Sequence, residues 1–484
     1  MILFFALLIL ASVFSAKVTN RFGIPVLFAF LAVGVIVGSD GLNLFYFNDA
    51  KLTKKIADLI LIFVLFDGGF RTTRKQLHLV AMPALTLATL GVIITAVVLG
   101  AFIHLVMHYD FITSMMIASI IASTDAAAVF LITKQNPIQG RLAATLNVES
   151  AANDPMAILL TLAFVSLLAG QSSTPLEFVG NLLWQFSGGV LIGFLLSHAA
   201  RFLFDHLEVE NRGYYYVLIV GVILLTYGAA DFIRANGIIA VFFMGYWLGN
   251  SSFVGKRGVS NFLEGIATFG TMALFVMLGL LAFPSHFVNI WKEGLLIVVL
   301  MVFIARPIAV LISTFPFHYP LKERGFLMWG GIKGAVPIVL ATYPAAYGLD
   351  PNGNVFNIIF FAVIFSCLVQ GSTLGPLAKL LKLTGGPKQQ GTPFSVELHS
   401  VKKSDLDVFE FYIRKDTDCV GKTIIELGLY KDVVITSIVR KGKIIPPKGD
   451  VKLYEEDILF ILAPVKLIKP LAALLNKGKR IEEF

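Results

Sequence analysis

Apolar runs long enough to span a lipid bilayer recur from the first residues of this chain to about Leu383. Of the 484 residues 57% are hydrophobic and 14% are charged, whereas about a quarter of the residues of a soluble protein are charged. The pattern predicts an all-α polytopic membrane domain. We count about thirteen runs, and they begin near Ile2, Ile24, Ile56, Val80, Ile112, Leu142, Phe178, Tyr214, Phe232, Phe262, Leu295, Phe326 and Phe356.

Basic residues between these runs indicate how the chain is oriented. The first run has no positive residue before it, so we interpret it as a spanning helix and not as a signal peptide. With its N-terminus outside, most loops rich in Lys and Arg fall on the cytoplasmic side, as does the C-terminus. The segment with Lys51, Lys54 and Lys55 is the exception. The net charge of +8 therefore predicts a membrane orientation and no nucleic-acid partner.

With an odd number of spans, runs one to six and runs eight to thirteen are inserted in the membrane in opposite directions, as inverted-repeat transporters require. Runs five and twelve then correspond, and polar residues and glycines interrupt both of them, at 121–126 and 330–337. Paired interrupted helices are typical of an ion site near the bilayer midplane. The sequence thus predicts two broken helices at the centre of the membrane domain.

The last hundred residues contain no spanning run. We expect a membrane domain at 1–384, a linker at 385–395 and a small α+β cytoplasmic domain at 396–484. Short alternating segments predict strands at 408–413, 433–439 and 458–462, around a helical stretch near 422–429.

Ionisable residues inside the membrane are costly, roughly 2.5 to 3.5 kcal/mol for an aspartate at the centre of a helix, so each is a functional candidate. Ser150 and Asp154 lie four residues apart and share a helix face, where their oxygens could bind a small cation. Glu149 points elsewhere and could pair with Lys333 or Arg306. Six charges lie well inside apolar runs, namely Asp67, Asp125, Glu149, Asp154, Arg306 and Lys333.

The ends of broken helices carry partial charges that need a partner in a dry environment. Asp125 suits helix N-termini and Lys333 suits helix C-termini. Asp67 could contact the ion or form an ion pair with Arg71. The Thr124 hydroxyl could bind the ion or donate to the preceding turn of its own helix.

Four segments of the membrane domain combine charged or polar residues with small ones, namely Phe66-Asp67-Gly68-Gly69, Ser123-Thr124-Asp125-Ala126-Ala127-Ala128-Val129, Glu149-Ser150-Ala151-Ala152-Asn153-Asp154-Pro155 and Gly330-Gly331-Ile332-Lys333-Gly334-Ala335-Val336-Pro337. They resemble segments of the bacterial NhaP-type cation:proton antiporters, closest to the potassium/proton branch. Through 420–427 and 438–442, the tail is similar to TrkA-C-like subdomains of regulator-of-potassium-conductance modules.

The resemblance implies that Asp154 binds the proton and a monovalent cation, helped by Asn153, Ser150, Thr124 and Asp67. From the residues themselves we interpret Asp125, Glu149, Lys333 and Arg306 as structural charges near that site. The resemblance also implies a crossing of the two broken helices, a homodimer in the bacterial inner membrane, elevator-like movement and an unidentified ligand for the tail.

The expected activity is exchange of cytoplasmic K+, ahead of Na+, for external H+. One carboxylate at the site favours electroneutral exchange, although Lys333 stands where relatives have arginine and a buried lysine loses its proton more readily. A tail-gated cation channel is the alternative, but no TVGYG filter is present.

An enzyme is a further reading, with Asp67 and Asp154 as its catalytic pair. The two cysteines, Cys367 and Cys419, and eight scattered histidines form no metal-binding spacing. No phosphate-binding GxxxxGK[ST] motif occurs either. We therefore expect no enzymatic activity and no cofactor beyond the transported ions.

Overall fold

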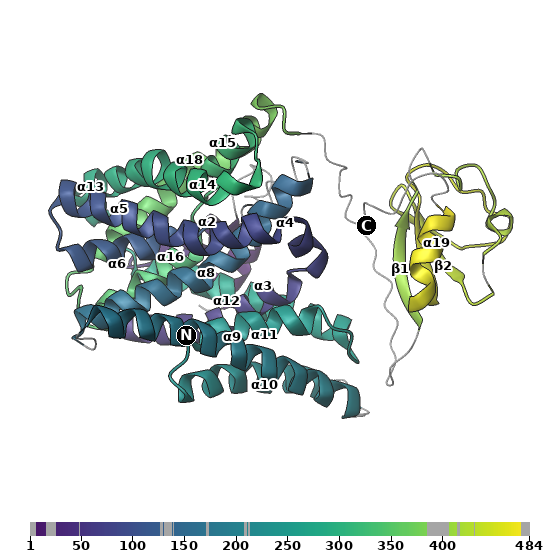
Figure 1. Cartoon of the computed structure of the whole chain (residues 1–484), viewed down its shortest axis with the longest axis horizontal. Helices are drawn as coiled ribbons and strands as arrows, with labels where there is room; N and C mark the ends of the chain where they lie inside the picture. The colour runs from purple at the N-terminus through teal and green to yellow at the C-terminus, as the bar shows by residue number, and fades with distance from the viewer. Residues whose placement is uncertain are drawn as a thin grey trace. The chain divides into compact units, whose positions relative to one another are not determined.

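The structure is a computed structural model. It describes residues 6–15, 26–47, 49–125, 129, 138, 140–170, 174–207, 211, 213–384, 406–413, 417–429 and 431–475. The chain divides into two units. The helical unit comprises Met1–Phe202, Tyr216–Ser252 and Val259–Lys388, and the second unit comprises Leu203–Tyr215, Phe253–Gly258 and Gln389–Phe484 (Figure 1).

The helices follow the predicted apolar runs. A first apolar helix covers Ala6–Ser15. The α-helices after it are α2 (Val26–Val37), α3 (Ala50–Arg71), α4 (Arg74–Thr86), α5 (Val92–Met107), α6 (Phe111–Ala122), α8 (Gly140–Leu168), α9 (Pro175–His206), α10 (Gly213–Phe232), α11 (Gly237–Gly249), α12 (Lys256–Leu281), α13 (Phe287–Leu300), α14 (Arg306–Thr314), α15 (Leu321–Trp329), α16 (Ala335–Leu340), α17 (Thr342–Ala346) and α18 (Asn354–Leu380).

Seven of the described helices are long and apolar enough to cross a membrane. Five more are apolar but only ten to seventeen residues long, and α3 has 22 residues with several charges. Together they occupy the thirteen predicted positions, and two of the shorter ones, Phe111–Ala122 and Ala335–Ala346, belong to the runs that polar residues interrupt. The prediction of a polytopic all-α membrane domain is confirmed.

Two corresponding spans contain the same irregularity. A π-helical turn at Leu87–Gly91 joins α4 to α5, and another at Met301–Ala305 joins α13 to α14. These are runs four and eleven, which the inverted-repeat prediction pairs. Such turns insert a residue into a helix and often mark functional regions.

Close glycine contacts define a first helix group, made of α2, α3, α9, α10, α11 and α12. A Cβ atom on Gly69 of α3 would lie 2.2 Å from the Phe242 carbonyl oxygen of α11, so only glycine permits this approach. Gly279 of α12 meets α2 in the same way, and Gly193 of α9 meets α11. The remaining helices of the unit, α4 to α6, α8 and α13 to α18, form a second helix group through contacts such as α6 with α8 and α13 with α18.

The C-terminal domain is a four-stranded antiparallel sheet with strand order β1-β4-β2-β3, and α19 (Ile468–Leu475) contributes Leu471 and Leu475 to its core. The predicted strands are confirmed within one or two residues. The strands are β1 (Leu406–Tyr412), β2 (Val434–Arg440), β3 (Lys443–Ile445) and β4 (Ile458–Pro464).

The helix predicted near 422–429 is wrong. This segment is a turn with a single 3-10 stretch at Ile425–Leu427, which ends at Gly428 with a φ of 57°. Such a left-handed residue stops a helix, and glycine adopts it without strain. The predicted linker at 385–395 lies outside the described residues.

Candidate ion-binding site at the helix crossing

Two extended segments meet at the centre of the helical unit. Helix α6 ends at Ala122, and Ser123 is extended with a ψ of 159°. In run twelve the helix stops at Trp329 and resumes at Ala335. The backbone N–H of Asp125 donates a hydrogen bond of 2.7 Å to the Ile332 carbonyl, so the two interruptions lie against each other. The predicted pairing of the broken helices is confirmed.

Charged side chains face the helix ends produced by this interruption. The Lys333 ammonium donates to the carbonyl oxygens of Ala122, at 3.2 Å, and Ser123, at 3.0 Å. These carbonyls lie at the C-terminus of α6, where a positive charge offsets the partial negative charge. Asp125 lies against Gly334, which precedes α16: a Cβ on that glycine would be 2.5 Å from the Asp125 Cβ. The lysine and the aspartate occupy the helix ends expected from their charges.

A buried polar cluster lies beside the crossing and joins it to α8. The Thr124 and Ser150 hydroxyls are 2.9 Å apart, and the Asn153 amide donates to the Thr124 hydroxyl at 2.6 Å. The Thr124 N–H also donates to the Asn153 side-chain oxygen at 3.3 Å. Thr124 thus binds α8 and not its own preceding turn. Three of the residues predicted from the sequence are brought together.

Asp154 lies one helical turn after Ser150 on the same face of α8. Its Oδ1 atom is buried and has no hydrogen-bond partner among the described residues. Asp125 and Lys333 are close enough to act on the Asp154 carboxylate electrostatically, and the Ser123 side chain also lies beside it. The Lys333 ammonium nevertheless bonds to carbonyls, and Arg306 bonds to another acid. A buried carboxylate oxygen without a partner is costly, and a proton or a cation would satisfy it.

Glu149 is the acid that Arg306 neutralises. The Arg306 Nη1 and Glu149 Oε1 atoms are 2.5 Å apart, and the two side chains are 6% and 1% exposed. Arg306 also donates to the Leu327 carbonyl at 3.1 Å. The pair therefore joins α8, α14 and α15. Of the two partners that the sequence left open for Glu149, the structure selects Arg306.

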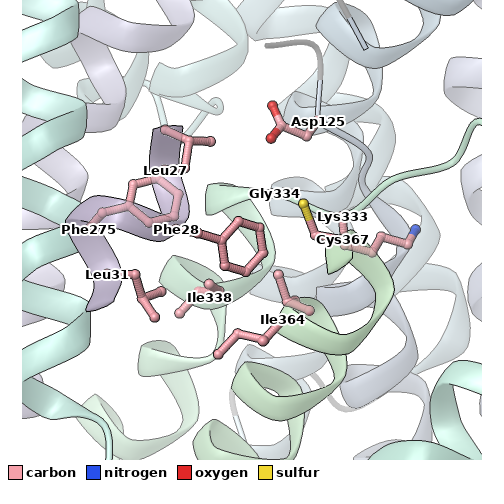
Figure 2. Close-up of a pocket in the computed structure, with 11 residues that line it drawn as sticks. Leu27, Phe28, Leu31, Asp125, Phe275, Lys333, Gly334, Ile338, Ile364 and Cys367 are labelled. Atoms are coloured by element: carbon pink, nitrogen blue, oxygen red, sulfur yellow. The ribbon is translucent and has the colours of Figure 1, made fainter. Parts of the chain in front are cut away.

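A narrow pocket adjoins the crossing, with a volume of about 10 Å³, which is room for about one water molecule. Leu27 and Phe28 of α2 and Phe275 of α12 form one wall, and Ile338 and Cys367 belong to the other. Figure 2 shows the Asp125 carboxylate at its edge and the Lys333 ammonium pointing away from it. No group of three or more His, Cys, Asp or Glu side chains in the described residues could hold a metal ion.

Comparison with known proteins places the chain in a family. The model described as "Sodium/hydrogen exchanger, transmembrane" matches residues 6–380. The chain belongs to the sodium/hydrogen exchanger family. A second model, "TrkA-C domain", matches residues 408–476.

Relatives of this exchanger share most of its length. The K(+)/H(+) antiporter NhaP2 of Shewanella sp. (strain ANA-3) is 33% identical over 99% of this chain and 83% of its own. The K(+)/H(+) antiporter NhaP of Alkalimonas amylolytica is 30% identical over 98% of this chain and 83% of its own. The fold is similar to that of the sodium proton antiporter MjNhaP1 from Methanocaldococcus jannaschii. The two structures superpose with a TM-score of 0.68 at 23% identity, over 78% of this chain and 98% of the other.

Asp67 is the predicted ligand that the structure does not bring to the crossing. Its carboxylate is 2.7 Å from Arg71, which is also 3.2 Å from Glu264. Of the two readings that the sequence left open, the structure of this exchanger shows the i, i+4 ion pair.

Sequence reasoning missed two features near the crossing. Proline at 155 lacks the N–H that would bond to the Ala151 carbonyl, which leaves that oxygen without its helical donor beside Ser150 and Asp154. The proline itself was the available signal. The apolar wall contributed by α2 and α12 had no signal, because single apolar residues in a spanning helix do not show which neighbour they face.

Proposed function

We propose that this exchanger moves K+ out of the cytoplasm in exchange for external H+, with Asp154 binding either ion in turn. The observation that supports it most is the buried Asp154 oxygen without a partner, one turn from Ser150 in the cluster with Thr124 and Asn153. Hydroxyl, amide and carboxylate oxygens are the ligands that hard cations take in proteins. K+ is chosen over Na+ because the curated relatives that span nearly the whole chain are K(+)/H(+) antiporters.

Competition at one carboxylate is enough to couple the two ions. When Asp154 is protonated it is a poor cation ligand, and a bound cation displaces the proton. Each crossing then carries one positive charge, so we propose electroneutral exchange. Because Lys333 bonds to the carbonyls that end α6, its charge is assigned to the fold and not to the transport cycle.

We further propose that the protein is a homodimer in a bacterial inner membrane, with its C-terminus in the cytoplasm. The loops with Lys and Arg support this orientation. In the most apolar stretch of α9 only 17% of the residues are buried within one chain. This leaves a long apolar face for a second copy or for lipid. Cross-linking in native membranes tests the dimer.

The tail is assigned a regulatory role, through an unidentified ligand, and exchange itself requires no cofactor or enzymatic step. Removal of all residues after Gly391 is expected to leave exchange intact and to change its pH profile. A profile identical to that of the full chain would contradict a regulatory tail.

The proposed activity is tested in proteoliposomes that contain a pH-sensitive dye. A K+ gradient should drive proton movement in the wild type and in Asp450→Asn, an exposed control in the tail, whereas Asp154→Asn should be inactive. Full exchange by Asp154→Asn would contradict the site assignment. K+ currents at rates beyond carrier turnover would identify a channel instead.

A further inference from the structure

A polar cluster joins the two helix groups at the end of the membrane domain where α3 begins. We call Lys54, Asp58 and Tyr343 the outer cluster. Lys54 and Asp58 belong to the second and third turns of α3, and Tyr343 belongs to α17. Helix α18 runs from Asn354 to Leu380 before the chain enters the tail, so α17 lies at the far end of that crossing. The outer cluster is therefore on the external side in the proposed orientation.

The contacts in the outer cluster are specific. The Tyr343 hydroxyl donates a hydrogen bond to Asp58 Oδ1, and the Lys54 ammonium is 2.6 Å from Asp58 Oδ2. The same ammonium lies 4.5 Å from the centre of the Tyr343 ring, within cation–π range. Both oxygens of the carboxylate are thus engaged. Tyr343 is 2% exposed, so its hydroxyl would lack a partner if α17 moved away without another donor or acceptor in reach.

The packing between the two helix groups differs between the outer cluster and the crossing. On the external side α17 packs against α3 through the outer cluster. Beside the crossing, the same boundary contains the narrow pocket between Leu27, Leu31 and Phe275 of the first group and Asp125 and Ile338 of the second (Figure 2). Bonded side chains thus join the two groups at the outer end, whereas beside the crossing the boundary contains a small cavity with room for about one water molecule. This asymmetry is what a carrier with its site closed to the outside requires.

Tyr343 is close to the candidate site along the chain. It lies ten residues after Lys333, and the short helix α16 lies between the two residues. Any movement of the crossing relative to α3 would therefore pull on the bond between Tyr343 and Asp58. An ion pair with an adjacent hydroxyl is suited to this position, because water can replace such bonds when the contact opens.

From these observations we infer that the outer cluster closes the cation site to the external side and must separate for the site to face outward. Asp58, Tyr343 and Lys54 are positioning residues for exchange, since they lie away from the transported ion. The inference rests on the proposed function. It adds a contact that opposes the outward-facing state of the carrier.

The test compares Tyr343→Phe with Tyr347→Phe in the full chain. Phenylalanine at 343 keeps the ring and its packing but removes the hydroxyl that bonds to Asp58. Tyr347 is a matched control on the same segment, because its ring lies 5.7 Å from the Lys54 ammonium and it is 47% exposed.

Two readouts separate a closing contact from simple packing. In Tyr343→Phe, hydrogen–deuterium exchange of the peptides over 342–349 should rise roughly tenfold, the shift expected for loss of one hydrogen bond to a charged group. The apparent affinity for K+ should improve outside and weaken inside by a similar factor, because the outward-facing state gains population. Tyr347→Phe should match the wild type in both measurements.

Unchanged deuterium exchange in Tyr343→Phe would overturn the inference, as would faster exchange with affinities that stay the same on both sides. A wild-type chain without K+-driven proton movement would overturn the proposed function instead. The deuterium measurement would still show in that case whether the outer cluster holds α17 against α3.

Discussion

Three acids inside the membrane domain differ in whether a base satisfies them. Glu149 is paired with Arg306 and Asp67 with Arg71, whereas Asp154 forms no ion pair with a base among the described residues; each of the three keeps one buried carboxylate oxygen without a hydrogen-bond partner. The sequence identified all three but could not assign their partners, because Lys333 and Arg306 are both isolated bases in distant apolar runs. Only the tertiary fold shows which base each acid reaches.

The buried ion pair of Glu149 should matter for stability. We expect Glu149→Gln to destabilise the protein by about 3–5 kcal/mol, because it leaves the Arg306 charge buried without compensation. Thermal unfolding of purified protein measures this. The double variant Glu149→Gln with Arg306→Met should recover most of the loss, and an unchanged single variant would show that the pair contributes little.

Ser150 should affect the cation more than the fold. Ser150→Ala removes a hydroxyl that lies 2.9 Å from the Thr124 hydroxyl, and we expect the KM for K+ to rise by about fivefold to tenfold, as for a lost interaction of about 1–1.4 kcal/mol. Ser119→Ala is the matched control, because that hydroxyl only bonds to the preceding turn at Met115, at 2.7 Å. Equal effects of the two changes would argue against Ser150 as a ligand.

Among the elements, the crossing of the two interrupted helices was the most predictable part of the site. Polar and glycine-rich interruptions in runs five and twelve are visible in the sequence, and the inverted-repeat argument pairs them. The tail shows the limit of the same reasoning. Its alternating strands were found, but a helix was predicted near 422–429 where the chain makes a turn ending at Gly428.

Gly334 is the position where the crossing allows least change. We expect Gly334→Ala to destabilise the protein by about 1–3 kcal/mol and to abolish exchange, because the new methyl group would meet the Asp125 side chain. Gly325→Ala in α15 is the control, since its added Cβ has nothing within 4 Å. Unfolding temperature and exchange rate check both variants, and a fully active Gly334→Ala would contradict the close contact.

The turn in the tail should respond to pH through Glu426. The Thr423 N–H donates to the Glu426 carboxylate at 2.7 Å, and this bond lowers the pKa of that carboxyl below its usual value of 4.5. A lowered pKa means that the stabilisation is complete above pH 4.5 and is lost as the pH falls through the lower folded value. Deuterium exchange over 420–429 in Glu426→Gln should exceed that of the wild type at pH 7. The difference should disappear in acid, whereas a constant difference would exclude this carboxylate as the cause.

For the whole molecule, the sequence predicted the class of protein better than its working parts. Run length and the paired interruptions predicted a polytopic carrier with a small C-terminal domain, and the family comparison agrees. The outer cluster was not predicted, since Lys54 was noted only as an exception to the charge rule. Contacts between helix groups depend on how helices rotate and pack, which hydropathy does not encode.

Competition between a proton and a cation for the Asp154 carboxylate can be measured without transport. Addition of K+ to purified protein in weakly buffered solution should release close to one proton per chain from the wild type and none from Asp154→Asn. Proton release that persists in Asp154→Asn would contradict the account, because another group would then carry the competition between the two ions.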